Sequence, residues 1–357
     1  MMWPDRRLCD LLGIDHPIVQ APMLGTCTPA LASAVSNAGA LGSLGCAEKP
    51  ADKVRREVAE IRERTDRPFN LNFFIREAPK TDPAVLERTR QRLQPWYDEL
   101  GLGDPPAELP EFGAGFDEAR LALTLELMPK VVSFHFGCPD QPSIEALKRA
   151  GITLVSSATC VAEAQALEAA GMDVIIAQGW EAGGHRGSHV PNDPNDGVGT
   201  LALVPQVVDA VSVPVIAAGG IGDGRGIAAA LALGACGVQM GTAFLRTPEA
   251  ATEPARRDRL RVATDRDTMV TDAFSGRCAR TVRSRFAEEM ERNREPLPAF
   301  LQMMALSGPI RNAASDADAS FLLYGQAAPL AQEMSARDIV GRLVEQTAAA
   351  MARLGSG

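Results

Sequence analysis

Eight short, mostly apolar segments recur between residues 16 and 242, and stretches with the pattern of amphipathic helices separate them. Apolar segments of this length indicate strands that are buried on both faces. Eight such strands with helices between them are what a (β/α)8 TIM barrel requires, and their number favours the barrel over a doubly wound open sheet. The predicted strands are residues 16–23, 41–45, 69–74, 131–136, 153–157, 174–178, 213–218 and 237–242.

Two stretches interrupt this alternation and suggest how the α/β chain is divided. Residues 76–115 are rich in proline and charge, which indicates an insertion after the third strand. Residues 246–319 carry charged helical stretches and no clear strand, which predicts a small, mostly helical second domain or cap. Residues 320–357 end in an amphipathic helix that we expect to pack back on the barrel. The barrel itself is then expected to occupy residues 1–245.

The composition excludes several classes of partner. A formal net charge of −9 argues against nucleic acid, because phosphate backbones are bound by basic surfaces. No apolar run is long enough to cross a bilayer, and the N-terminal residues lack the apolar segment of a signal peptide. We therefore expect a cytoplasmic protein that acts on small molecules and has no membrane partner. Seven irregularly spaced cysteines predict neither a disulfide framework nor a metal site. The oligomeric state stays open, a homodimer included.

In a barrel, the carboxyl ends of the strands form the rim where ligands bind. Several different predicted strands end in residues suited to binding or to proton transfer. These candidate site residues are Ala21, Pro22, Met23, Asn72, His135, Gln178, Gly183, Gly184, His185, Gly219, Gly220, Gln239, Met240, Gly241 and Thr242.

His185 is the strongest catalytic candidate. It follows the sixth predicted strand, which ends at Gln178, and it closes a glycine-rich loop. Glycines let the backbone approach a ligand closely, and histidine exchanges a proton near neutral pH. An ordinary loop histidine is the alternative. His135, near the end of the fourth predicted strand, is either part of a hydrogen-bonded wall or a contact to the ligand, and the residues alone do not decide between them.

Glycine turns follow the last two predicted strands, at Gly219–Gly220 and at Gly241–Thr242. Barrels often bind phosphate at this place through backbone N–H groups, and the Thr242 hydroxyl adds a donor. Two such turns predict a phosphate site, with plain tight turns as the alternative.

The segments around these residues resemble the nitronate monooxygenase family, formerly called 2-nitropropane dioxygenases. Gln20–Met23 resembles the first motif of the family, and Asn72 falls at the asparagine of its third-strand motif. Residues 177–187, with the histidine, are similar to the central signature of the family. Residues 215–220 with Asp223–Gly224, and residues 239–245, resemble its phosphate-binding turns, which many flavin barrels share. The resemblance covers most of the barrel.

The resemblance implies a bound FMN and a reaction. The phosphate would rest near Gly220 and Gly241–Thr242. The ring and ribityl chain would be lined by Ala21–Met23, Asn72, Gln178 and Gly183. Alkyl nitronates such as propionate 3-nitronate would be oxidised with O₂, through a flavin semiquinone, to a carbonyl compound and nitrite or nitrate. The cofactor carries this redox chemistry. His185 would take the α-proton from a neutral nitroalkane or hold an anionic nitronate beside the flavin.

Two other functions stay open. One keeps the fold and FMN but reduces its substrate with NAD(P)H, as a quinone reductase or a reductase of the enoyl-ACP type does. The other uses the glycine turns for a phosphorylated metabolite and binds no flavin.

Two stretches also depart from the family pattern: the insertion at 76–115, and Leu323–Gln326, which matches the C-terminal Gly-Gln motif only loosely.

Overall fold

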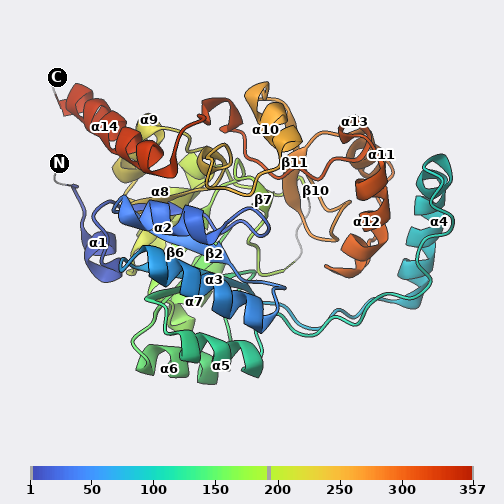
Figure 1. Cartoon of the computed structure of the whole chain (residues 1–357), viewed down its shortest axis with the longest axis horizontal. Coiled ribbons are helices and arrows are strands. Elements are labelled where there is room, and N and C mark those ends of the chain that lie inside the picture. The colour runs from blue at the N-terminus through green and yellow to red at the C-terminus, as the bar shows by residue number, and fades with distance from the viewer. Residues whose placement is uncertain (1–2, 191–193, 356–357) are drawn as a thin grey trace.

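Eight parallel strands close into a barrel in the computed structural model, which describes residues 3–190 and 194–355 (Figure 1). The strands follow the order β1-β9-β8-β6-β5-β4-β3-β2, and a parallel bridge between Val19 and Leu41 joins the two ends of that order. The predicted (β/α)8 barrel is therefore confirmed. Its strands are β1 (Ile18–Gln20), β2 (Gly42–Gly45), β3 (Phe69–Phe74), β4 (Val131–His135), β5 (Thr153–Ala158), β6 (Val174–Gln178), β8 (Val215–Ala218) and β9 (Gly237–Met240).

The barrel helices begin and pack as their sequences dictate. The side chain of Thr28 accepts a hydrogen bond from the Leu31 N–H, and the cap residues Asp117, Asp140 and Asp223 do the same for later helices. An apolar face at helical spacing then turns each helix toward the strands. The helices are α1 (Arg7–Leu12), α2 (Pro29–Asn37), α3 (Ala51–Arg64), α5 (Glu118–Leu127), α6 (Gln141–Arg149), α7 (Val161–Ala170), α8 (Thr200–Ala210) and α9 (Gly224–Ala232).

The cap contains a small antiparallel sheet, so the expectation of no strands in residues 246–319 is wrong. β10 (Thr268–Thr271) pairs with β11 (Ala279–Val282), and β11 pairs with β7 (Gly184–His185). These strands are only two to four residues long, and β11 carries Arg280, which made it look like part of a charged helix. Arg280 is buried because its guanidinium donates to the Trp180 carbonyl (2.8 Å) and to Thr268 Oγ1 (3.0 Å).

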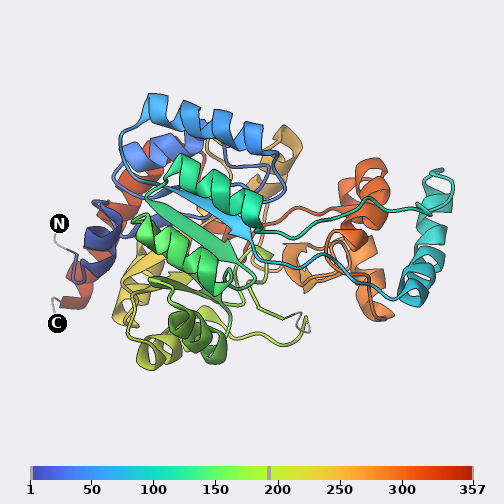
Figure 2. The ribbon, with the colours of Figure 1, turned by 90° about the horizontal axis from the view of Figure 1, so that it is seen from below.

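Helices make up most of the cap, and the insertion adds one of them. α4 (Pro83–Glu99) lies against the cap helices at the end of the molecule that is far from both termini (Figure 2). Its Tyr97 hydroxyl donates to the Leu306 carbonyl (2.7 Å), and its Trp96 ring N–H donates to Glu289 (3.1 Å). The insertion and the cap therefore share one hydrophobic core. The cap helices are α10 (Pro254–Arg261), α11 (Arg285–Arg292), α12 (Gln302–Ala313) and α13 (Asp316–Ala319).

The C-terminal segment returns to the barrel. A short turn, η2 (Ala328–Leu330), leads into α14 (Ala336–Gly355), which packs on α9 and α2. Within the described ranges, no helix combines the length and the apolar character needed to cross a membrane.

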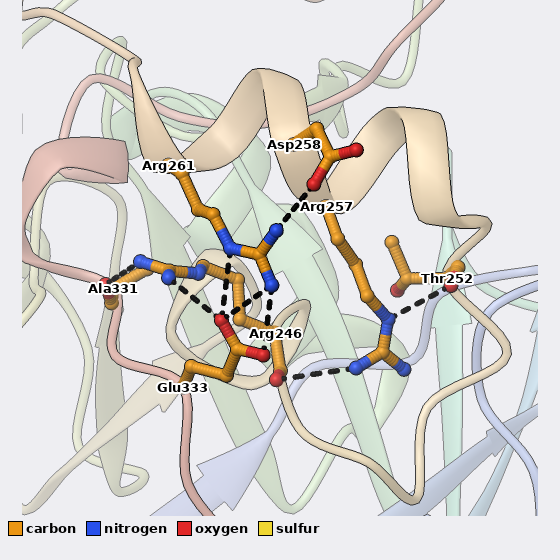
Figure 3. Close-up of polar contacts among 7 residues, drawn as sticks. All are labelled: Arg246, Thr252, Arg257, Asp258, Arg261, Ala331 and Glu333. Atoms are coloured by element: carbon orange, nitrogen blue, oxygen red, sulfur yellow. Dashed lines mark hydrogen bonds and ion pairs between the residues drawn. The ribbon is translucent and has the colours of Figure 1, made fainter.

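Arginine side chains of α10 contact other segments of the chain, so this helix is not a fully solvated face (Figure 3). Arg261 and Arg246 both pair with Glu333 of the C-terminal segment, at 2.9 and 3.0 Å. Arg257 donates to the carbonyls of Thr252 (3.0 Å) and Ala250 (2.8 Å). These contacts hold the start of the cap against the chain that leads into α14.

Candidate active site

Contacts between neighbouring strands place the candidate residues around one rim. The Ala21 N–H donates to the Met240 carbonyl (2.8 Å), which joins the ends of β1 and β9. A Cβ added at Gly241 would lie 3.4 Å from the Ala21 Cβ and 3.6 Å from the Met23 sulfur. The Gly179 N–H donates to the Ala218 carbonyl (2.8 Å), which joins the ends of β6 and β8. The ends of β1 and β9, and those of β6 and β8, are therefore joined at the same rim of the barrel.

The two glycine turns leave backbone N–H groups open. Gly219 and Gly220 have φ values of 109° and 71°, which residues with a side chain rarely adopt. Within residues 3–190 and 194–355, the N–H groups of Gly220, Gly241 and Thr242 donate to no protein acceptor. Unpaired N–H groups at the end of a barrel strand are the donors that a phosphate uses. We call this group of open N–H donors the anion cradle.

The C-terminal segment closes this cradle on one side. The Gly325 N–H donates to Thr242 Oγ1 (2.9 Å), and the Gln326 N–H donates to the Glu181 carbonyl (3.0 Å). A Cβ on Gly183 would lie 2.4 Å from the Gly325 nitrogen, so the two glycines are in direct backbone contact. The loosely matching stretch Leu323–Gln326 is thus part of the site.

Asn72 lies in the wall of the barrel mouth. Its amide nitrogen donates to the Ser133 carbonyl (3.1 Å) and hydroxyl (3.0 Å), which fixes the orientation of the amide. Its backbone carbonyl accepts from the Cys46 N–H (2.8 Å). The side chain is buried, and Asn72 is brought to the rim on the side opposite the glycine turns.

The side chains of Gln178 and His135 fix the backbone around His185. Its carbonyl oxygen accepts from the Gln178 amide (3.0 Å), and the His135 ring nitrogen Nε2 lies 3.1 Å away. The side-chain oxygen Oε1 of Gln178 in turn accepts from the Gly187 N–H (2.7 Å). Because Nε2 of His135 donates here, its Nδ1 accepts from the Ser157 hydroxyl (2.7 Å). His135 is therefore a hydrogen-bonded part of the wall.

The His185 ring is held in one tautomer by the cap. Its Nε2 lies 3.0 Å from Ser275 Oγ, and that hydroxyl donates to the Arg277 carbonyl (2.9 Å). Ser275 consequently accepts from His185, which places the ring proton on Nε2 and leaves Nδ1 as an acceptor. Burial lowers the pKa of His185 to about 3, and the charges of His135 and Arg277 act in the same direction. The imidazole is neutral at physiological pH.

Aromatic rings surround this imidazole. Phe136 and Phe300 meet it edge to face, with ring centroids 6.0 and 5.2 Å away. Phe136 has a φ of 75°, and Leu301, next to Phe300, has a φ of 73°. Such left-handed conformations are costly for these residue types and gather at functional sites. We call this apolar cluster the phenylalanine wall; its buried members are Phe136, Phe300 and Leu301, and Phe74, Phe112 and Met304 pack against them.

Sequence reasoning missed the residues that the cap supplies. Ser275 and Arg277 lie in the turn between β10 and β11, and no spacing in the sequence points from that turn to His185. Phe136 stands directly after His135 at a predicted strand end, so its position on the rim was the one available signal.

We expect His135 to make the fold acid-sensitive. Burial lowers its pKa from 6.5 to about 4, so between these values the unfolded chain binds a proton that the folded chain does not. The stability that this neutral ring contributes is present above pH 6.5 and is lost as the pH falls toward 4, by at most about 1.4 kcal/mol per pH unit. Urea unfolding between pH 7 and 4.5 checks this. The His135→Gln variant should show a flatter dependence on pH, and an unchanged slope would contradict it.

Comparison with known proteins gives a consistent result. The family model described as nitronate monooxygenase matches residues 5–346. A nitronate monooxygenase from Paraburkholderia phytofirmans is 46% identical over 344 residues, covering 95% of this chain and 94% of that protein. The nitroalkane oxidase structure from Streptomyces ansochromogenes has a TM-score of 0.88 at 39% identity, covering 98% and 99% of the two chains. FabK from Thermotoga maritima has a TM-score of 0.73 at 33% identity, with 98% of each chain covered.

Proposed function

Because the chain belongs to the nitronate monooxygenase family of flavin-dependent oxidoreductases, we propose that it holds FMN at the barrel mouth and oxidises alkyl nitronates there with O₂. The products are a carbonyl compound and nitrite or nitrate. The observation that carries this proposal is the neutral His185 ring, fixed by Ser275 with Nδ1 free to accept, on the same rim as an open anion cradle.

The residues present fit FMN. Its phosphate suits the free N–H groups of Gly220, Gly241 and Thr242, and the hydroxyl of Thr242 accepts from Gly325 and so keeps its own proton for donation. The rim residues Ala21–Met23, Asn72, Gln178 and Gly183 would face the remainder of the cofactor. FMN, when bound, supplies the electron transfer and the reaction with oxygen.

The protein supplies orientation and one proton-handling group. Nδ1 of His185 can take the α-proton from a neutral nitroalkane, because the ring is neutral and its other nitrogen is occupied by Ser275. When the substrate is already an anionic nitronate, the proton has left, and His185 positions the substrate instead. The phenylalanine wall excludes water from the reacting atoms.

The proposal is tested first on the purified protein. It should be yellow and should release FMN, identified by mass, when it is denatured. With ethyl nitronate in air, it should consume O₂ and produce nitrite or nitrate. A colourless protein that neither binds FMN nor consumes O₂ would contradict the proposal and would favour a phosphate-binding barrel without flavin.

A second function, reduction of a substrate by NAD(P)H, is favoured by one observation. FabK from Thermotoga maritima shares the fold along nearly the whole chain at 33% identity. A reductase would bleach its flavin with NADH in the absence of air, whereas the monooxygenase would not. The likeness to the Streptomyces nitroalkane oxidase is greater in both TM-score and identity, so we rank the reductase second.

The phenylalanine wall predicts which nitronates are preferred. A carboxylate pressed against these apolar rings would lose its water, and the rings themselves offer it no hydrogen-bond partner, which costs several kcal/mol for an unpaired charge. We therefore expect kcat/KM for butyl-1-nitronate to exceed that for propionate 3-nitronate, of nearly equal length, by about tenfold or more. Oxygen-electrode kinetics on the two compounds at one pH measure this ratio. A ratio near one, or a preference for the carboxylate, would show that the wall does not select the substrate.

A further inference from the structure

An arginine that forms no ion pair with any described residue lies beside the proposed catalytic histidine. Arg277 belongs to the cap turn between β10 and β11, and its guanidinium carbon lies 3.9 Å from the centroid of the Phe136 ring. Phe136 in turn meets the His185 ring edge to face at 6.0 Å. Arg277, Phe136 and His185 thus lie in a row, each beside the next. Arg277, which the cap supplies, is the member of this row that is charged at neutral pH.

The guanidinium is only partly used by the protein. Nη2 donates to the Ser188 carbonyl, whereas Nε and Nη1 donate to no acceptor among the described residues. Neither nitrogen is a fully buried atom without a partner, and Arg277 as a whole is only partly buried. Glu163 is the carboxylate that acts on Arg277 electrostatically, but its oxygens are bound to Thr159 and to the His189 N–H. Two nitrogens of a half-buried cation, Nε and Nη1, are left for a ligand.

The other buried arginines near the site differ in this respect. Arg186 donates to the carbonyls of Gly179 (2.6 Å) and Gln178 (3.0 Å), and Arg280 donates to Trp180 and Thr268. Both brace the loop after β6. Burial lowers the pKa of Arg277 to about 10, so it still carries its charge at neutral pH. A charged donor at the edge of an apolar cluster is suited to an anion with an apolar tail.

We propose that Arg277 binds the oxyanion head of the substrate, while the phenylalanine wall receives its alkyl chain. This rests on the proposed function, because a nitronate has two oxygens that share one negative charge and, in an alkyl nitronate, an apolar chain. Arg277 would then be a specificity residue that favours the anionic nitronate over the neutral nitroalkane. An ion-paired hydrogen bond of this kind contributes enough for a tenfold to hundredfold change in affinity when it is removed.

The experiment uses the flavin-loaded protein and two probes. Nitrate, a planar oxyanion, is titrated while the flavin absorption is followed, and ethyl nitronate is used for steady-state kinetics. Arg277→Met and Arg277→Gln should each weaken nitrate binding and raise KM for ethyl nitronate by at least tenfold, with kcat changed less than about threefold. Arg277→Lys keeps the charge and should stay within about fivefold of the wild type. Arg283→Met, which removes an exposed cation from the same cap, is the matched control and should change neither value.

The outcomes separate the two claims. Wild-type nitrate affinity and KM in both neutral variants would overturn the role of Arg277, as would an equal loss in all three Arg277 variants. A wild type that consumes no O₂ with ethyl nitronate would overturn the proposed function instead, and nitrate titration would still test Arg277. If Arg277→Met loses its flavin, Arg277→Gln and Arg277→Lys decide, because both keep a donor for the Ser188 carbonyl.

Discussion

Replacing His185 with asparagine is expected to lower turnover on neutral nitroalkanes by about 100-fold or more while FMN stays bound. The magnitude is that of a lost general base. The imidazole is held by Ser275 and by the edges of Phe136 and Phe300, and no bond joins its ring to the glycine turns that we assign to the phosphate. The flavin spectrum should therefore resemble that of the wild type. Turnover is measured as O₂ consumption with nitroethane.

His189 offers the matched control for this substitution. It lies four residues further along the same loop, and its ring nitrogen Nε2 lies 3.3 Å from the Ser157 carbonyl rather than near the phenylalanine wall. His189→Asn should keep turnover within a few-fold of the wild type. Near-normal turnover of His185→Asn on neutral nitroalkanes would remove His185 from its proposed catalytic role.

Adding a single methyl group at Gly183 is expected to cost most of the bound FMN. The new Cβ would lie 2.4 Å from the Gly325 nitrogen and 2.4 Å from the Tyr324 carbonyl carbon, and backbone atoms cannot rotate away. The C-terminal segment would have to leave the cradle that it closes through the bond from Gly325 to Thr242. Overpacking of this kind destabilises by about 1–3 kcal/mol. We expect Gly183→Ala to retain less than a tenth of the wild-type FMN after dialysis.

The control for this prediction is Gly341→Ala in α14. No heavy atom lies within 4 Å of a Cβ at this exposed position, and alanine favours a helix over glycine by about 1 kcal/mol. This variant should keep its FMN and unfold at or above the wild-type temperature. If Gly183→Ala binds FMN as well as Gly341→Ala does, the contact between the central loop and the C-terminal segment is not needed for the cofactor.

The barrel could be predicted from the sequence because each of its strands is an apolar segment followed by a helical stretch, and four of those helices begin at a capping Thr or Asp. Each of the eight barrel strands falls on a predicted segment. The bounds of β3 and β6 agree, β5 is one residue longer than expected, and the others are shorter: β1 covers Ile18–Gln20 where residues 16–23 were expected. The glycine turns could be located for the same reason, since each turn follows directly from a buried strand. His185 was found through its place after β6 and its glycine-rich loop.

The cap could not be predicted in the same detail, because its elements depend on contacts between distant parts of the chain. β11 looks charged through Arg280, which is buried only because Trp180 and Thr268 accept its hydrogen bonds. β7 exists because residues 184–185 pair with β11, almost a hundred residues later. Ser275 and Arg277 come to His185 through that pairing, so a search of barrel strand ends could not find them.

The most direct test of the account is anaerobic mixing of the flavin-loaded protein with an alkyl nitronate and, separately, with NADH, while the flavin absorption is followed. The account predicts that ethyl nitronate reduces the bound flavin within the time of one turnover and that NADH leaves the flavin oxidised. Rapid bleaching by NADH together with no change on adding the nitronate would contradict it and would assign this barrel to the reductases.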